Sequence, residues 1–140
     1  MPKGAPLAKP ELSTQDRILN SAERLFSERG IDGVSLREIT TDSGVNSASL
    51  HYHFGSKIAV LERIFELRAA PIAEERERLL SQLKTNRQGR PKVEDVLYAF
   101  LRPALESQET ADGDSFRMLR ARLAFEREEV RRRVLDKAFN

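Results

Sequence analysis

The run from Ser13 to Ile58 constrains the fold of this chain more than any other part of the sequence. It contains two short helical patterns joined by Ser43-Gly44-Val45-Asn46. Gly44 stands where a left-handed residue is needed to reverse the chain, and Val45 is expected to fill the corner between the helices. Two amphipathic helices joined by a glycine-centred turn are typical of a helix-turn-helix, whose second helix lies in the major groove of DNA.

The first two helices of this run carry recognisable start and stop signals. Ser13 or Thr14 is expected to cap the first helix, which has apolar residues at helical spacing and ends at Gly30. Ser35 and Glu38 have the spacing of a capping box, in which each side chain satisfies a backbone N–H of the other residue. The second helix is therefore expected to begin directly after Ser35.

The third, or recognition, helix is expected to open at Asn46 or Ser47 and to run to about Phe54. Leu50 and Phe54 are four residues apart, so both are expected to anchor the helix to the core. The other side chains are then expected to lie on or near the free surface, and they include Ser47, Ala48, Ser49, His51 and Tyr52.

The rest of the chain also has helical spacing and no convincing strand pattern. Lys57 is expected to open a fourth helix that Pro71 breaks or kinks and that continues to about Lys84. Further helices are expected at about 93–105, interrupted by Pro103, at 116–125 and at 130–139, with loops at 85–91 and 111–114. The sequence therefore predicts an all-α protein of seven or eight helices. It divides into a flexible N-terminal arm (1–12), a helix-turn-helix head (13–58) and a helical C-terminal domain (59–140).

Composition excludes several classes of protein. The chain has 140 residues and no cysteine, so it has no disulfide framework, thiol nucleophile or cysteine-based zinc site. It has no apolar run near the roughly 20 residues that span a bilayer and no signal-peptide pattern, so we expect a cytoplasmic protein without a membrane partner. A Gly-rich phosphate loop, a Gly-x-Ser-x-Gly elbow and a His-Glu-x-x-His pair are all missing, so we expect no enzyme activity. His51 and His53 are two residues apart on one helix and cannot share an ion, so we expect no metal or cofactor.

Charge leaves a second interpretation open. The chain has 24 basic and 22 acidic residues, for a net charge of +2, and the two signs balance in the part up to Val60. A strongly basic head would have supported nucleic-acid binding independently, and this head is neutral. The alternative is a helical protein-interaction module that has lost DNA binding.

Three motifs together resemble the DNA-binding domain of TetR-family transcriptional regulators. They are Val34-Ser35-Leu36-Arg37-Glu38-Ile39, then Gly44-Val45-Asn46, then Leu50-His51-Tyr52-His53-Phe54-Gly55-Ser56-Lys57. The resemblance implies a three-helix head that binds double-stranded DNA and a helical C-terminal domain that binds a small-molecule effector. It further implies a homodimer that acts as a ligand-responsive repressor on a palindromic operator.

Carried over to this sequence, the resemblance assigns roles to individual residues. Ser35, Tyr52 and Lys57 would contact phosphate. His53 falls on the histidine of the family motif and is likewise expected among the DNA-binding residues. Ser47, Ala48, Ser49 and His51 lie where the family's recognition helix meets bases. Many members have glycine in place of Ala48 and tyrosine in place of His51, so the operator sequence is not expected to match that of relatives.

Length is a further departure from the family pattern. Family chains are usually longer, with two more helices that form the four-helix bundle of the dimer. This chain stops at Asn140, so we expect a truncated ligand-binding and dimerisation domain. A monomer or a loosely associated dimer is the corresponding expectation.

Overall fold

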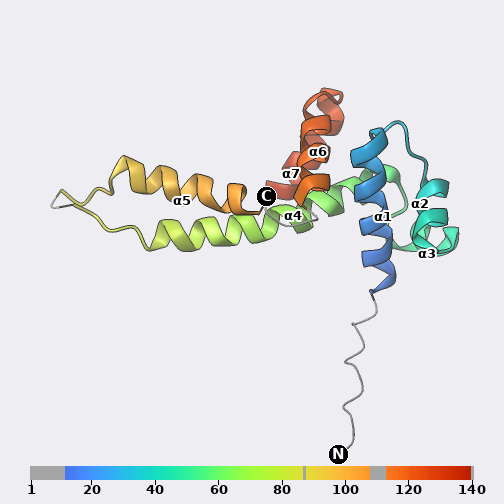
Figure 1. Cartoon of the computed structure of the whole chain (residues 1–140), viewed down its shortest axis with the longest axis horizontal. Coiled ribbons are helices and arrows are strands. Elements are labelled where there is room, and N and C mark those ends of the chain that lie inside the picture. The colour runs from blue at the N-terminus through green and yellow to red at the C-terminus, as the bar shows by residue number, and fades with distance from the viewer. Residues whose placement is uncertain (1–11, 87, 108–112, 140) are drawn as a thin grey trace, which may run out of the picture.

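The computed structural model describes residues 12–86, 88–107 and 113–139, and these parts of the chain form seven α-helices (Figure 1). The all-α prediction is confirmed. The predicted N-terminal arm at 1–12 lies outside the described residues except for Leu12. The helices are α1 (Thr14–Arg29), α2 (Leu36–Ser43), α3 (Ser47–His53), α4 (Lys57–Ser81), α5 (Val93–Glu106), α6 (Gly113–Ala124) and α7 (Glu128–Phe139).

Helices α1, α2 and α3 form the head of the molecule, on the right of Figure 1. Each contributes apolar side chains at helical spacing to a shared core, and the start of α4 closes that core. The fully buried side chains of this part are Ile18, Ala22 and Phe26 of α1, Ile39 of α2, Leu50 of α3, and Val60 and Leu61 of α4. Burial of apolar side chains such as these is the main stabilising contribution to a small helical unit.

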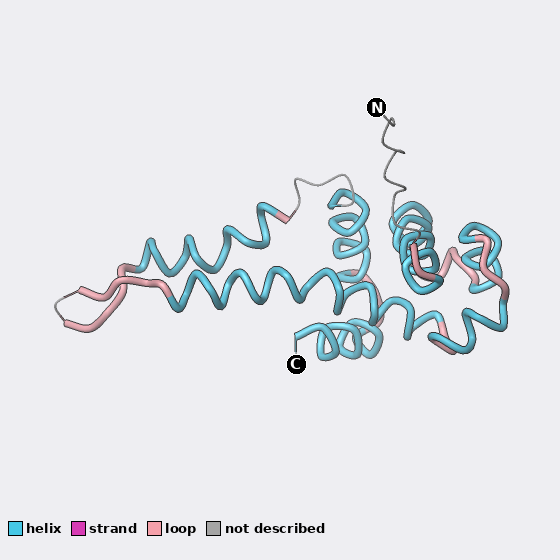
Figure 2. The backbone as a smooth tube through the Cα atoms, turned by 90° about the horizontal axis from the view of Figure 1, so that it is seen from below, coloured by secondary structure: helices cyan, strands magenta, loops and turns pink. Residues whose placement is uncertain are grey.

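Helix α4 leaves the head and runs beside α5, so that the two form a helical hairpin that projects from the rest of the molecule (Figure 2). We call residues 71–86 and 88–106 the hairpin. Of the break or kink predicted at Pro71, the break is wrong, because α4 continues through this residue to Ser81. The predicted interruption at Pro103 is wrong as well, because α5 continues through it. A proline removes one backbone hydrogen bond, and α4 has tertiary contacts on both sides of Pro71. Ala69 is buried just before Pro71, and the Arg76 side chain donates to the carbonyl of Phe100 after it.

The remaining two helices pack against both the head and α4. Helix α6 lies against α1, and α7 lies against α4. Leu119 of α6 and Val134 of α7 are fully buried and belong to the same core as Phe26 and Phe65. The predicted loop at 111–114 is wrong at its second half, since α6 begins at Gly113 with the acidic Asp114 in its first turn. A single apolar core therefore connects the head to the C-terminal helices.

One ion pair also joins the head to α4. Arg68 donates from Nε and Nη2 to the carboxylate of Glu23, with both N···O distances at 2.9 Å, and the Glu23 side chain is almost completely buried.

Among the described residues, no helix is both long and apolar enough to cross a membrane.

Candidate nucleic-acid interface

The two helices of the helix-turn-helix have their ends satisfied by nearby side chains. The Ser35 hydroxyl accepts from the backbone N–H of Glu38 at 3.2 Å, and the Glu38 carboxylate accepts from the backbone N–H of Ser35 at 2.8 Å. Gly44 is left-handed, with φ of 64°, and Asn46 Oδ1 accepts from the Ser49 N–H at 2.7 Å. The predicted capping box, left-handed glycine and Asn46 cap are therefore confirmed.

Arg17 of α1 holds the turn between α2 and α3 in place. Its Nη2 donates to the carbonyls of Ser43, at 2.7 Å, and Gly44, at 3.1 Å. A Cβ added to Gly44 would come within 2.8 Å of the same Nη2. Sequence reasoning missed Arg17, because its partners lie 26 and 27 residues away and no local pattern indicates that contact.

Two other arginines of α1 form ion pairs with acids of α2. Arg24 pairs with Asp42, and Arg29 Nη1 lies 2.8 Å from Glu38 Oε1. The hydrogen bond from Arg24 holds the pKa of Asp42 below its usual value. Hydrogen bonds from the Ser35 backbone and hydroxyl, supported by Arg29, lower the pKa of Glu38 to about 2. Two of the basic side chains of the head are therefore already paired with acids of the head itself.

The recognition helix presents a polar outer face and an apolar inner one. Ser47, Ala48 and His51 are exposed, and Tyr52 is 86% exposed. Leu50 is fully buried, and Phe54, just after the helix, packs partly buried against the core, so both predicted anchors are confirmed. An exposed aromatic hydroxyl and imidazole on one helix are suited to hydrogen bonds with phosphates or base edges.

Three predicted site residues already have partners within the chain. The Ser35 hydroxyl donates to the Glu38 carboxylate at 2.8 Å, and the Lys57 ammonium donates to the Val34 carbonyl at 3.1 Å. His53 is half-buried, with Nδ1 at 3.1 Å from the side-chain nitrogen of Gln15 and its ring edge-on to Tyr52 at 5.2 Å between centroids. Ser49 is half-buried near the start of α3. Lys57 keeps two further N–H donors beside the one bonded to Val34, so its contact with phosphate stays a prediction.

Arg37 is a cation that sequence reasoning did not select. It lies in the first turn of α2 and is exposed, and within the described parts of the chain its guanidinium has neither a hydrogen bond nor an ion pair. Its position two residues after Ser35, inside the capping-box motif, is the signal that would have indicated it.

Among the described residues, no cluster of histidine, cysteine, aspartate and glutamate is placed to hold a metal ion.

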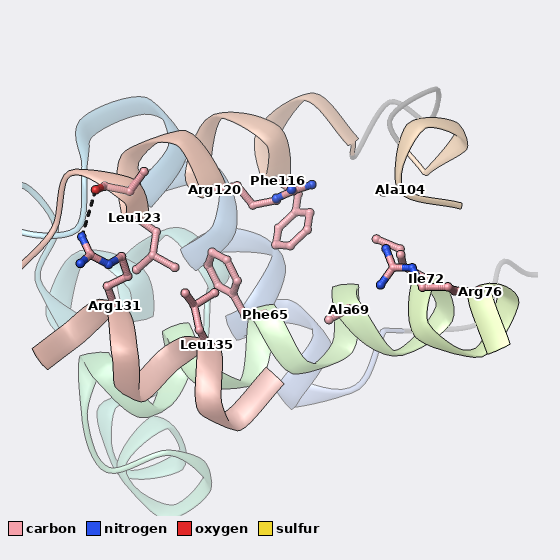
Figure 3. Close-up of a pocket in the computed structure, with 11 residues that line it drawn as sticks. Phe65, Ala69, Ile72, Arg76, Ala104, Phe116, Arg120, Leu123, Arg131 and Leu135 are labelled. Atoms are coloured by element: carbon pink, nitrogen blue, oxygen red, sulfur yellow. Dashed lines mark hydrogen bonds between the residues drawn. The ribbon is translucent and has the colours of Figure 1, made fainter. Parts of the chain in front are cut away.

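A cavity of about 250 Å³ lies away from this face, between α4, α5, α6 and α7 (Figure 3). Its wall is largely apolar, with Phe65 and Leu123 buried and Phe116 edge-on to Phe65 at 5.1 Å between ring centroids. Arginines from three helices line it as well: Arg76, Arg120 and Arg131.

Comparison with known proteins gives a consistent assignment for the head. Residues 18–64 match the model of the bacterial regulatory proteins of the tetR family. The chain is 43% identical over 49 residues to the biofilm operon icaADBC HTH-type negative transcriptional regulator IcaR of Staphylococcus aureus (strain Newman). It is 39% identical over 54 residues to the probable HTH-type transcriptional regulator YttP of Bacillus subtilis (strain 168). These matches cover 35% and 39% of this chain and 26% of each relative, so they span about a quarter of the relatives' length.

Solved structures show the same fold over most of the chain. The TetR family transcriptional regulator PfmR from Thermus thermophilus superposes with a TM-score of 0.63 at 23% identity, over 91% of this chain and 64% of that one. The structure described as superantigen PfiT superposes with a TM-score of 0.64 at 23% identity, over 93% of this chain and 65% of that one. At this level of identity the likeness concerns the fold alone.

Proposed function

Since this chain belongs to the TetR family of bacterial regulators through its residues 18–64, we propose that it is a sequence-specific DNA-binding transcriptional regulator. The observation that carries the proposal is the outer face of α3. Ser47, Ala48, His51 and Tyr52 are exposed there, on a helix whose turn is held by Arg17. A helix presented rigidly in this way can enter the major groove without first being ordered.

The proposed contacts divide into those that position the head and those that read sequence. Ser47, Ser49 and His51 read base edges, with Ala48 close to the bases. Ser35, Tyr52 and Lys57 contact phosphate, and His53 supports Tyr52 from within the chain. Arg37 adds a phosphate contact, since its charge is not neutralised by a neighbour in the described structure. Phosphate contacts fix register, whereas contacts with base edges give specificity.

We infer that two copies act together as a repressor on a palindromic operator. One α3 per protomer requires half-sites about 34–36 Å apart, which is one turn of B-DNA. The relative IcaR is described as a negative regulator, which supports repression as the direction of control.

The contact between α6 and α1 supports regulation by a small molecule. Arg122 of α6 donates from Nε to the Ser27 carbonyl at 2.9 Å and from Nη2 to the Glu28 carbonyl at 3.0 Å. Both carbonyls belong to the last turn of α1, where carbonyls lack a partner within the helix and cations are favoured. The same α6 lines the cavity with Phe116, Arg120 and Leu123. A ligand that favours another position of α6 would therefore shift α1 and, through Arg17, the turn before α3.

Selection of binding sites from a random duplex pool at moderate salt tests the proposal. We expect a palindromic site to be enriched by the full chain. Enrichment of single half-sites would contradict the dimer but not the head. A failure to enrich any sequence, together with the absence of salt-dependent duplex binding, would support the interaction module instead. The ion pairs of Arg24 and Arg29 with α2 favour that alternative.

Two variants then separate positioning from reading. Lys57→Ala should weaken binding to all sequences alike and reduce the salt slope by about one charge, whereas Lys84→Ala, an exposed lysine just beyond the end of α4, should change neither. His51→Ala should change preference at one operator position by about 1–3 kcal/mol. A uniform loss for His51→Ala, or an unchanged slope for Lys57→Ala, would exclude the corresponding contact.

A further inference from the structure

The cavity between α4, α5, α6 and α7 combines an apolar wall with an excess of positive charge. Phe65, Ala69 and Leu123 are almost completely buried and form its inner wall. The charged residues that line it are Arg76, Arg120 and Arg131, and among the described residues no carboxylate lines it. Three like charges around one apolar space create a positive potential that only an anion relieves.

The three arginines differ in how far their charges are already engaged. Arg76 donates from Nε to the Phe100 carbonyl at 3.1 Å, and its guanidinium lies 4.2 Å from the centroid of the Phe100 ring. Arg131 donates to the Ala124 carbonyl at 3.4 Å. Arg120 is exposed, and within the described residues its side chain forms no hydrogen bond or ion pair. Its donors are therefore the most available to a ligand.

The positions of these side chains define an orientation for the ligand. In Figure 3, Arg120 and Arg76 lie towards the end of the cavity near Ala104, and Phe65 and Leu135 lie between them and Arg131. An anionic group held by Arg120 and Arg76 would therefore leave its apolar body against Phe65, Leu123 and Leu135. A cationic ligand would be repelled at both ends.

The size of the cavity limits the apolar body. At roughly 30 Å³ for a water-sized group, about 250 Å³ holds roughly eight such groups. The cavity is at the small end of ligand sites, which favours a small ligand over a nucleotide or another large polar anion.

We propose that this cavity binds a small amphipathic anion, a hydrocarbon body of about eight to ten carbons with one terminal carboxylate, anchored by Arg120 with Arg76 as the second donor. The role of this molecule as the effector rests on the proposed function. Its binding to the cavity does not, because that binding requires no DNA.

Calorimetric titration of the full chain with four ten-carbon probes, below their micellar concentrations, tests the ligand class. The probes are decanoate, decyl phosphate, 1-decanol and decyltrimethylammonium. We expect decanoate to bind at least about tenfold more tightly than decanol, because guanidinium bonds to an anion are charge-assisted, and the cation not to bind. Decyl phosphate binding more tightly than decanoate would overturn the carboxylate head and assign a phosphate. Equal binding of decanol and decanoate, or no binding of any probe, would overturn the proposal.

Matched arginine variants then test the anchor. Arg120→Gln should reduce decanoate affinity about tenfold and leave decanol unchanged, and Arg120→Lys should retain part of the affinity. Arg117→Gln is the control, since Arg117 lies on the same helix, pairs with Asp114 at 3.0 Å and does not line the cavity. Equal losses for Arg117→Gln and Arg120→Gln, or no loss for Arg120→Gln, would overturn the anchor.

Ala104→Phe, which fills the end of the cavity, should weaken decanoate and decanol together. Unchanged binding of both would show that the ligand lies elsewhere and overturn the site.

The duplex selection, run without ligand on the same samples, keeps the two proposals apart. Retained DNA binding without decanoate binding overturns the ligand class alone, whereas decanoate binding without DNA binding overturns the proposed function.

Discussion

The head (α1–α3) and the hairpin (residues 71–86 and 88–106) have the same secondary structure but bury very different amounts of it. In the head, one or more apolar residues of every helix are fully buried, and side-chain caps satisfy the start of each helix. In the hairpin, α5 has no side-chain cap, and its buried residues are Ala99 and Pro103. Most of its large apolar side chains are exposed: Val93, Leu97, Tyr98, Phe100, Leu101 and Leu105.

The regular spacing of apolar residues therefore predicts a helix but not its burial. The spacing in α5 is as regular as that in α1, yet α5 packs chiefly along α4, whereas α1 packs against α2, α3, α4 and α6. Regions with few buried apolar contacts open at lower free energy than the core of the same molecule. We therefore expect the head to be the most stable part of the chain and the hairpin to be less stable.

The largest expected effect comes from the same truncation made in both regions. Leu50→Ala removes a fully buried side chain from the head and should cost about 3–5 kcal/mol of unfolding free energy. Leu101→Ala removes a side chain that is 49% exposed in the hairpin and should cost less than about 1 kcal/mol. Urea denaturation followed by circular dichroism measures both. Similar costs would contradict the difference in burial between the head and the hairpin, because they would mean that Leu101 is buried in solution.

A smaller effect is expected from a matched pair of glycines. Gly44 in the head and Gly89 in the hairpin have φ of 64° and 73°, so alanine costs about 1–2 kcal/mol at either position. At Gly44 the new Cβ also collides with Arg17, whereas at Gly89 nothing lies within 4 Å. Gly44→Ala should therefore be more destabilising than Gly89→Ala in urea and should also weaken DNA binding. Equal destabilisation would show that the Arg17 contact contributes nothing.

The smallest effect concerns acid stability. The pKa of Glu38 is lowered to about 2, so the folded state binds its proton less readily than the unfolded state does. Its contribution is therefore fully present above about pH 4.5 and is lost as the pH falls towards 2. Thermal melts should show Glu38→Gln less stable than the parent protein at pH 7, with the difference vanishing near pH 2.

Glu75→Gln in the hairpin is the control for this titration. The pKa of Glu75 is also lowered, chiefly by a hydrogen bond from Arg78 on the same helix turn. Glu38 pairs instead with the start of α2 and with Arg29 of another helix. A larger pH-dependent change for Glu75→Gln than for Glu38→Gln would contradict the view that the head is the more tightly connected region.

The helices of the head, their caps and the two residues that anchor α3 could be predicted from local sequence patterns. Ser13, Ser35 and Asn46 each bond to a backbone N–H three residues later, and Gly30 and Gly44 end helices through their own backbone conformation. Such contacts lie within one helical turn, so the order of residue types contains them. The exposed face of α3 was predicted for the same reason.

The contacts that connect these helices could not be predicted in this way and are visible in the folded chain alone. Arg17 reaches the turn before α3 from 26 residues away, and Arg122 reaches the end of α1 from 95 residues away. Lys57 bonds to Val34, and α4 continues through Pro71 beside α5. The cavity exists because α4, α5, α6 and α7 bring their side chains together. These features depend on side chains that meet in space at large sequence separation, and local propensity and periodicity carry no information about such meetings.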